Sequence, residues 1–345
     1  MSTRVALSWR GKDLHLALGL AGVMVLTLLG TQAAGVLGRY KVDVATTLLT
    51  FIALSQAWNI LAGFAGQFSL GVSAFVGTGA YAAGLAQIHL GAGYLTATLV
   101  AGAAGGVLSL LLSQPLLRLR GDYFSIGTLA AALALQAWLL NWSYAGGSTG
   151  LSLPLAGLPD GGGVFRLSCV VAGLAMGTAL FVSRSRFGLR LKAVRDHEHA
   201  ASGLGVSVFR HRLIALLLHG LLVGLAGGVI ALQQASFEPG GMLSLSWTIN
   251  ALLMAIVGGI GTVVGPVVGA VVVYNLLTKQ FSGHPTLGLI LEGLLLIVIV
   301  RFAPRGLWPL LTDSCRRIGR LWGSGGNPSQ PSAPEAVTLA EPAPV

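Results

Sequence analysis

The chain has 345 residues, of which 54% are hydrophobic and only 9% are charged, and its mean hydropathy is +0.79. A soluble domain normally carries about 25% charged residues, so this composition excludes a water-soluble globule and indicates a surface that mostly faces lipid. The net charge of +10 comes largely from short segments between apolar runs. That pattern is typical of cytoplasmic membrane loops and gives little support to nucleic-acid binding.

The apolar runs are about 20 residues long, which matches a helix that crosses roughly 30 Å of hydrocarbon. Only helices and closed barrels satisfy every backbone group in lipid. We therefore predict an all-α, polytopic membrane bundle of about ten transmembrane helices, with eight to ten as the range. The candidate spans are 14–30, 44–62, 68–88, 93–113, 123–142, 166–183, 212–234, 246–262, 264–280 and 287–303.

Two of these predictions leave alternatives open. The run 14–30 resembles a secretory signal peptide in position, but it is long and more spans follow, so we expect a retained first helix. The pair across 246–280 is interrupted by glycines and by Pro266. It is either two short spans or one broken element.

Charged residues in the loops predict the orientation. The segment 184–212 carries seven arginine and lysine residues against two acidic ones, which places it in the cytoplasm. Ten spans with both termini in the cytoplasm agree with this placement, although Arg39 and Lys41 then fall outside. Along the chain we expect an N-terminal segment with the first helix (1–43), a main membrane domain (44–309), and a tail (310–345) that is basic and then rich in proline and alanine. A tail of this composition is predicted to be disordered.

The sequence also argues against several kinds of chemistry. A phosphate-binding loop needs two glycines at fixed spacing before its lysine, and the single Gly-Lys pair, Gly11-Lys12, has Ala6 at the upstream position. No cysteine–histidine cluster has zinc spacing, so we expect neither a metal site nor catalytic residues. Ion-coupled carriers usually bury charged residues in the membrane. Here only Glu292 lies within an apolar run, where a boundary residue is the simpler interpretation.

The loop 184–212 contains the most informative segment. We predict a short amphipathic helix over 193–201, ended by Gly203 and Gly205. Such a helix at the cytoplasmic face is either a lever that another protein holds or a solvated basic loop that only fixes topology.

This segment resembles the coupling loop of ABC importer permeases, whose Glu-x-Ala-Ala signature corresponds to residues 198–201, with Gly205 after a spacer. Other segments are similar to branched-chain amino acid permeases in the same order along the chain, and 118–124 resembles the LivM-type subunit rather than its LivH-type partner. The similar segments are 57–71, 118–124, 146–151, 258–266 and 304–307.

The resemblance implies a type II ABC importer fold and a permease subunit of an ATP-driven importer in the bacterial inner membrane. Its substrates would be branched-chain amino acids or related small solutes. Two ABC ATPase subunits, a homologous LivH-type permease and a periplasmic solute-binding protein would be its partners. ATP and magnesium would bind to the ATPase subunits, and this chain would hold no cofactor. A urea or short-chain amide permease and, in other classes, an ion-coupled secondary carrier or a channel remain alternatives.

The resemblance also assigns roles to particular residues. The expected ATPase-coupling site consists of Arg195, Asp196, Glu198, Ala200, Ala201 and Gly205. The candidates for lining the translocation pathway are Asn59, Gly63, Gly66, Gln67, Ser69 and Gly71, for which interhelical hydrogen bonding and close packing are at least as favoured. The cytoplasmic mouth would include Arg118, Gly121 and Asp122, with Arg118 and Asp122 placed to form an ion pair.

Overall fold

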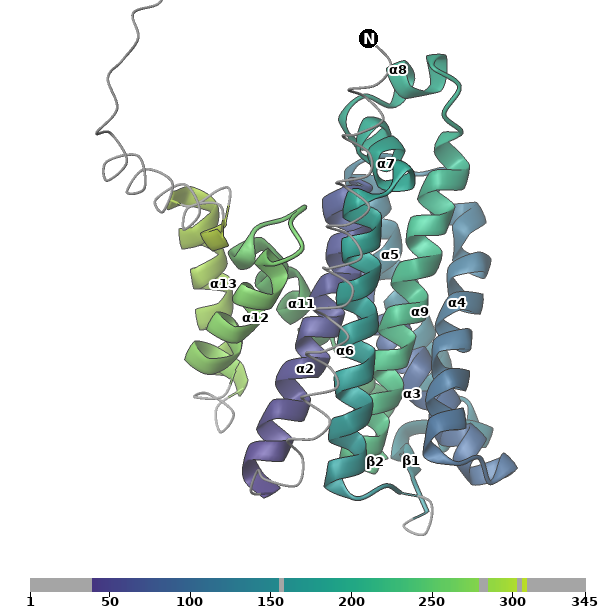
Figure 1. Ribbon diagram of the computed structural model, residues 1–345. Coiled ribbons are helices and arrows are strands. Elements are labelled where there is room, and N and C mark those ends of the chain that lie inside the picture. The colour runs from purple at the N-terminus through teal and green to yellow at the C-terminus, as the bar shows by residue number, and fades with distance from the viewer. Residues whose placement is uncertain (1–38, 155–157, 279–284, 303–305, 309–345) are drawn as a thin grey trace, which may run out of the picture.

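The computed structural model describes residues 39–154, 158–278, 285–302 and 306–308. Within these ranges the chain is almost entirely helical, and the long helices lie roughly parallel to one another (Figure 1). The predicted first span at 14–30 and the tail at 310–345 lie outside the described residues.

The elements follow the predicted spans closely. The longer helices are α2 (Arg39–Asn59), α3 (Val72–Leu90), α4 (Tyr94–Leu116), α5 (Asp122–Leu140), α6 (Gly161–Arg184), α9 (Val208–Gln234), α11 (Leu245–Gly258) and α13 (Pro285–Phe302). The shorter elements are η1 (Ile60–Phe64), η2 (Ser143–Ala145), η3 (Gly147–Thr149), α7 (Arg186–Asp196), α8 (Glu198–Gly203), α10 (Pro239–Met242), α12 (Gly265–Val273) and η5 (Tyr274–Thr278). Strands β1 (Leu151–Ser152) and β2 (Ser236–Phe237) pair antiparallel.

Every candidate span after residue 43 contains a helix. Six described segments are long and apolar enough to cross a membrane: 40–64, 94–116, 122–140, 161–184, 208–234 and 239–258. The prediction of a helical membrane bundle is therefore confirmed. The count of about ten crossings stays a prediction, because α11 and α12 are short and the first predicted span lies outside the described ranges.

Helices α3, α4 and α9 pack through glycine, with their backbones in direct contact. A Cβ atom on Gly79 would lie 2.3 Å from the carbonyl oxygen of Gly224, and one on Gly105 would lie 2.1 Å from that of Gly220. Small residues allow this approach in lipid, where van der Waals packing rather than water exclusion holds helices together. Gly79, Gly220 and Gly224 therefore serve close helix packing.

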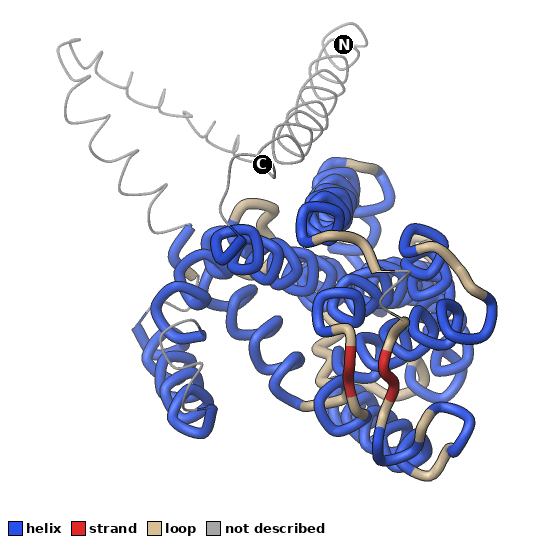
Figure 2. The backbone as a smooth tube through the Cα atoms, turned by 90° about the horizontal axis from the view of Figure 1, so that it is seen from below, coloured by secondary structure: helices blue, strands red, loops and turns tan. Residues whose placement is uncertain are grey.

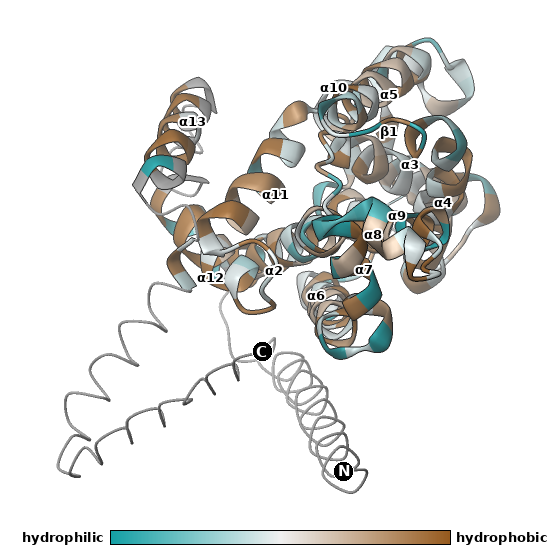
Figure 3. Ribbon diagram, turned by 90° about the horizontal axis from the view of Figure 1, so that it is seen from above, coloured by the Kyte–Doolittle hydropathy of each residue, from teal (hydrophilic) through white to brown (hydrophobic). Residues whose placement is uncertain are grey.

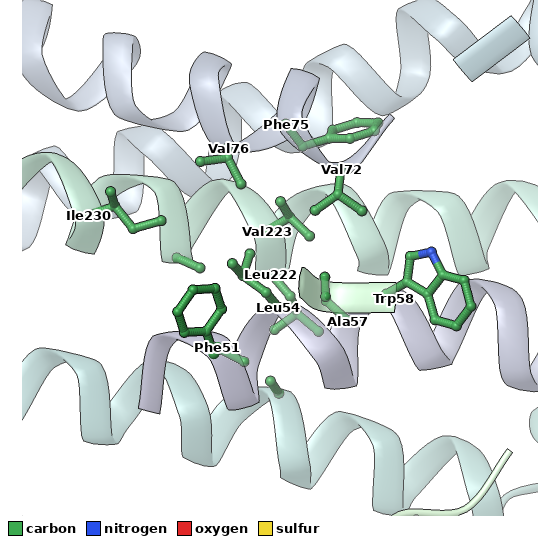
Figure 4. Packing of buried hydrophobic residues seen from close by; sticks show 14 of the residues in the cluster. Phe51, Leu54, Ala57, Trp58, Val72, Phe75, Val76, Leu222, Val223 and Ile230 are labelled. Carbon is green, nitrogen blue, oxygen red and sulfur yellow. The ribbon is translucent and has the colours of Figure 1, made fainter. Parts of the chain in front are cut away.

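A hydrophobic cluster joins α2 to α3 and α9 in the middle of the bundle (Figure 4). Its members are fully or almost fully buried, and they come from helices far apart in the sequence. Those labelled in Figure 4 are Phe51, Leu54, Ala57, Trp58, Val72, Phe75, Val76, Leu222, Val223 and Ile230. The cluster thus packs α2 against both α3 and α9.

The segment 246–280 resolves into two short helices. Helices α11 and α12 are joined by a turn over 259–264, and both lie with α13 on the side of α2 away from α4 (Figures 1 and 3). Close backbone contact holds the pair together, since a Cβ atom on Gly258 would lie 1.8 Å from the carbonyl oxygen of Gly265. Whether the two short helices are separate spans or one broken membrane element stays a prediction.

Aromatic side chains and the small β-sheet mark the end of the bundle opposite α7 and α8. The two strands lie side by side when the molecule is seen from below (Figure 2). The rings of His89 and Tyr144 stack with centroids 4.4 Å apart. Helix α6 begins at Gly161, earlier than the predicted 166, because Asp160 caps it by accepting a hydrogen bond from the Gly163 amide at 2.9 Å.

Candidate functional site

Helix α2 does not end in a regular turn at the basic end of the bundle. It widens into the π-helical turn η1 and stops at Gly66, whose φ is +71°. The Gln67 amide donates to Leu61 O at 3.1 Å and the Gly66 amide to Ala62 O at 3.2 Å. In these two hydrogen bonds, a glycine in the left-handed conformation ends the helix, and its own amide and the next one bind carbonyl groups of the last turn.

Helix α7 lies directly against this turn. Arg195 Nη1 donates a hydrogen bond to Gly63 O at 2.6 Å, although 132 residues separate the two. A Cβ atom on Gly66 would lie 2.5 Å from Arg195 Cγ, so only glycine admits the arginine stem. Lys192 adds a cation–π contact, with Nζ 5.3 Å from the centre of the Phe64 ring. The expected coupling residue Arg195 therefore holds the broken end of α2.

Asn59 connects the same turn to the loop between α11 and α12. Its Nδ2 donates to Thr262 O at 2.8 Å, and its Oδ1 accepts from the Gly261 amide at 2.8 Å. A Cβ atom on Gly63 would lie 2.7 Å from the Gly261 nitrogen, so the two segments are in backbone contact. The Asn59 side chain is buried and engaged at both ends, which favours the interpretation as a bridge over that as a pathway liner.

The segment after η1 is irregular but tightly held. Ser69 is fully buried; its Oγ accepts from the Gly71 amide at 3.2 Å, and its carbonyl accepts from Trp58 Nε1 at 2.9 Å. A Cβ atom on Gly71 would lie 2.6 Å from Thr128 O on α5. Gln67 is also buried, and its Oε1 has no hydrogen-bond partner among the described residues. The side-chain oxygen of Gln67 is thus able to accept a further hydrogen bond.

The predicted helix over 193–201 is wrong in its bounds. The structure has two helices, α7 and α8, separated by His197 in an extended conformation (φ −150°, ψ 92°). Helix α7 begins earlier because Ser185 Oγ accepts from the Gly188 amide at 3.1 Å. The break at His197 turns the next residues towards α9, where Glu198 finds its partner.

Glu198 anchors α8 to α9. Its Oε2 lies 2.9 Å from Arg212 Nη2, and its Oε1 lies 3.9 Å from Arg120 Nη2. Within α8, the side chain of Ala201 is buried, whereas that of Ala200 is exposed. Of the two alanines in the signature, Ala200 alone is thus free to contact another protein in this structure.

The other residues of the coupling and mouth sets surround α8 without forming one cluster. Asp196 accepts a hydrogen bond from Arg195 Nε at 2.8 Å, and Gly205 has a φ of +82° that ends α8. Gly121, with a φ of +55°, and Asp122 are exposed at the start of α5. Within the described part of the chain Arg118 donates to Gln114 Oε1 at 3.4 Å, and the expected Arg118–Asp122 ion pair is not formed.

The order of helices and the arrangement at this end can now be compared with known proteins. A family model described as "branched-chain amino acid transport system / permease component" matches residues 40–300. The chain belongs to this permease family. Its predicted resemblance to branched-chain amino acid permeases is confirmed.

Several curated relatives of this permease are membrane subunits of transport systems. The high-affinity branched-chain amino acid transport permease LivM of Salmonella typhimurium is 30% identical over 322 residues, covering 84% of this chain and 74% of LivM. LivM of Escherichia coli matches to the same extent. A probable LivH of Methanocaldococcus jannaschii is 27% identical, covering 60% of this chain and 71% of LivH.

Sequence reasoning did not find the partners that hold this permease's candidate site together. Arg212 was counted only as a loop charge, yet it pairs with Glu198. Gly261 and Thr262 lie in an interrupted span and in a segment that resembles the family, but neither pattern predicts that their backbones meet Asn59. The glycine-rich turn was the available signal, since a helix interruption at membrane depth must be satisfied by protein groups.

Proposed function

We propose that this permease is the membrane-spanning subunit of an ATP-driven importer that carries branched-chain amino acids or related small solutes into the bacterial cell. The LivM relatives, which are named as branched-chain amino acid permeases, support this substrate class. A guanosine permease of Bacillus subtilis and an autoinducer 2 import permease of Klebsiella pneumoniae match about half of the chain. Branched-chain amino acids are therefore the first solutes to test.

The partners follow from what this chain lacks and what its family does. Two ABC ATPase subunits would bind ATP and magnesium, a homologous LivH-type permease would complete the pore, and a periplasmic binding protein would deliver solute. The sequence contains no phosphate-binding loop of its own. Energy for uptake must then arrive through contact with another subunit, and α8 is the proposed point of contact.

One observation carries the proposal: hydrogen bonds link α7, which α8 follows in the sequence, to η1 and to the turn over 259–264. Arg195 joins α7 to η1 through Gly63, and Asn59 joins η1 to the 259–264 turn through Gly261 and Thr262. Because these are hydrogen bonds between broken helix ends, a displacement of α7 pulls on both segments. A pull from an ATPase subunit on α8 would thereby reach the end of α2 and the turn between α11 and α12.

Charge supports placing this end in the cytoplasm, with the termini on the same side. Seven basic residues stand against two acidic ones in 184–212, and Arg118 and Arg120 add to them. Hydrophilic residues gather over α8 and the α6–α7 turn when the molecule is viewed from above (Figure 3). Excess arginine and lysine in short loops favours the cytoplasmic side.

The test is uptake of radiolabelled leucine into proteoliposomes that hold this chain with its second permease and two ATPase subunits. Binding protein is added outside and ATP is enclosed inside. We expect uptake to require ATP and to be lost in Ala200→Arg, because the new side chain occupies the exposed face of α8. Thr96→Arg, an exposed position at the opposite end, controls for the added charge.

Two results would contradict the proposal. Uptake that follows a proton or sodium gradient without ATP would identify a secondary carrier instead. Normal uptake by Ala200→Arg would show that α8 transmits nothing. In either case, surface labelling must first establish that the variant enters the membrane as the parent does.

A further inference from the structure

A second site lies beside α8, outside the contacts that link α7 to η1. It is a cavity of about 330 Å³ between the end of α4, the turn that follows it, α8 and the start of α9. Its lining includes the apolar residues Leu117 and Phe209, three arginines and one acidic residue, Glu198; the arginines are Arg118, Arg120 and Arg212.

The charge in this cavity is only partly compensated. Glu198 pairs closely with Arg212 and more distantly with Arg120, whereas Arg118 donates to the neutral side chain of Gln114, so the lining has three arginines and one carboxylate. Arg212 Nε is buried and has no hydrogen-bond partner in the part of the chain that the structure describes. Two positive charges are left over, and a planar guanidinium group suits the oxygen atoms of a phosphate.

The surroundings of the cavity point to lipid as the source of that anion. Helices α4 and α5 flank the cavity. They are the least buried of the six long apolar segments, with 39% and 22% of the residues in their most apolar stretch buried. Tyr123 is 72% exposed at the start of α5 and Phe209 is 46% exposed at the start of α9. Aromatic rings at that height are typical of the membrane–water interface.

We propose that this cavity binds the phosphodiester headgroup of an anionic phospholipid. Arg118 and Arg120 would hold the phosphate oxygens from the α4–α5 turn, and Arg212 would hold them from α9. The apolar walls would receive the glycerol and upper acyl carbons. Basic pockets between helices on the cytoplasmic side are known to bind such headgroups.

Occupation of the cavity would act on α8 through Glu198. A phosphate competes with this carboxylate for the same arginines, so bound lipid loosens the Glu198–Arg212 pair that anchors α8 to α9. This effect is distinct from solute transport. Lipid binding itself does not depend on the proposed transport role.

The experiment is native mass spectrometry of the full-length chain, purified with its partner subunits and titrated with phosphatidylglycerol or with phosphatidylcholine of the same acyl chains. Binding is repeated at about 0.5 M ammonium acetate, a volatile salt that screens diffuse attraction. The variant is Arg118→Gln with Arg120→Gln, since both side chains are exposed and their loss leaves the Glu198–Arg212 pair intact. The matched control is Arg184→Gln with Arg190→Gln, which removes the same charge from exposed positions outside the cavity.

We expect the parent protein to prefer phosphatidylglycerol, and the cavity variant to lose about tenfold or more of that affinity while the control loses much less. Equal loss in both variants, or no preference between the two lipids, would overturn the proposal. Displacement of the lipid by millimolar inorganic phosphate would identify a small-anion site instead. Unchanged lipid binding with lost ATPase association would identify a protein contact and would also overturn it.

Discussion

The glycine-packed bundle of α3, α4 and α9 and the hydrogen-bonded junction of η1, α7 and the 259–264 turn are built in different ways. In the bundle, backbones touch wherever glycines face each other, as at Gly105 and Gly220. In the junction, side chains reach across more than a hundred residues to carbonyl groups at helix ends, as Arg195 does to Gly63.

This difference separates a rigid part from a transmitting part. Where two helix backbones are in contact, there is no room for an added side-chain atom unless one of the backbones moves. Polar contacts between broken helix ends are worth little individually in a membrane, about 0.6 kcal/mol on average. They are able to break and re-form during a transport cycle, so substitutions in the bundle should cost folding and those in the junction should cost uptake.

The largest effect is expected in the bundle. Gly105→Ala places a methyl group 2.1 Å from Gly220 O, and we expect a loss of about 2 kcal/mol or more in unfolding free energy. The matched control is Gly293→Ala in α13, where a Cβ atom meets nothing within 4 Å, and a gain of up to about 1 kcal/mol is expected. Unfolding in mixed micelles measures both. Equal effects would show that the close approach is not a constraint.

The next effect concerns the arginine that links α7 to η1. Arg195→Gln keeps a polar side chain but removes the charge-assisted hydrogen bond to Gly63, and ATP-driven uptake should fall about tenfold. Thermal stability should change little, because the bundle is untouched. Arg190→Gln, exposed on the same helix, is the control. A drop in melting temperature that matches the drop in uptake would assign Arg195 to folding instead.

A finer test distinguishes a bridge from a pathway liner at Asn59. Asn59→Asp keeps the acceptor for the Gly261 amide but replaces the donor to Thr262 O. A bridging role predicts a lower maximal rate of uptake with an unchanged KM and unchanged preference among solutes. An altered solute preference would instead show that Asn59 lines the translocation pathway. Uptake measured over a range of leucine and valine concentrations separates the two.

The smallest effect is expected from the ion pair that anchors α8. A double-mutant cycle of Glu198→Gln and Arg212→Gln should give a coupling energy of about 1 kcal/mol, because the pair is only partly buried. The coupling should shrink in about 1 M salt. Thermal unfolding of the four proteins provides the values. A coupling that is zero in low salt would remove Glu198 as an anchor.

Much of the fold could be predicted from the sequence. Apolar length located the long helices after residue 43, because it depends on local composition. The bounds of α7 and α8 could not be predicted in the same way. The break at His197 depends on where Arg195 and Glu198 find partners in distant segments.

The candidate site was predicted as three separate sets of residues, and the structure brings parts of two of them together. Arg195 from the expected coupling set contacts Gly63 and Gly66 from the expected pathway set. No periodicity or local propensity encodes such a pairing. The small sheet between β1 and β2 was missed for the same reason, since each strand has only two residues.

The central claim is that α8 contacts an ATPase subunit, and cysteine cross-linking in the assembled transporter tests it most directly. Ala200→Cys, in a background with Cys169 and Cys315 replaced by serine, is treated with a short bis-maleimide, and the parallel control is Thr96→Cys at the opposite end. The account predicts a cross-link to the ATPase subunit from Ala200→Cys alone. Labelling of Ala200→Cys by a membrane-impermeant reagent added from the periplasm, with no cross-link to the ATPase, would contradict it.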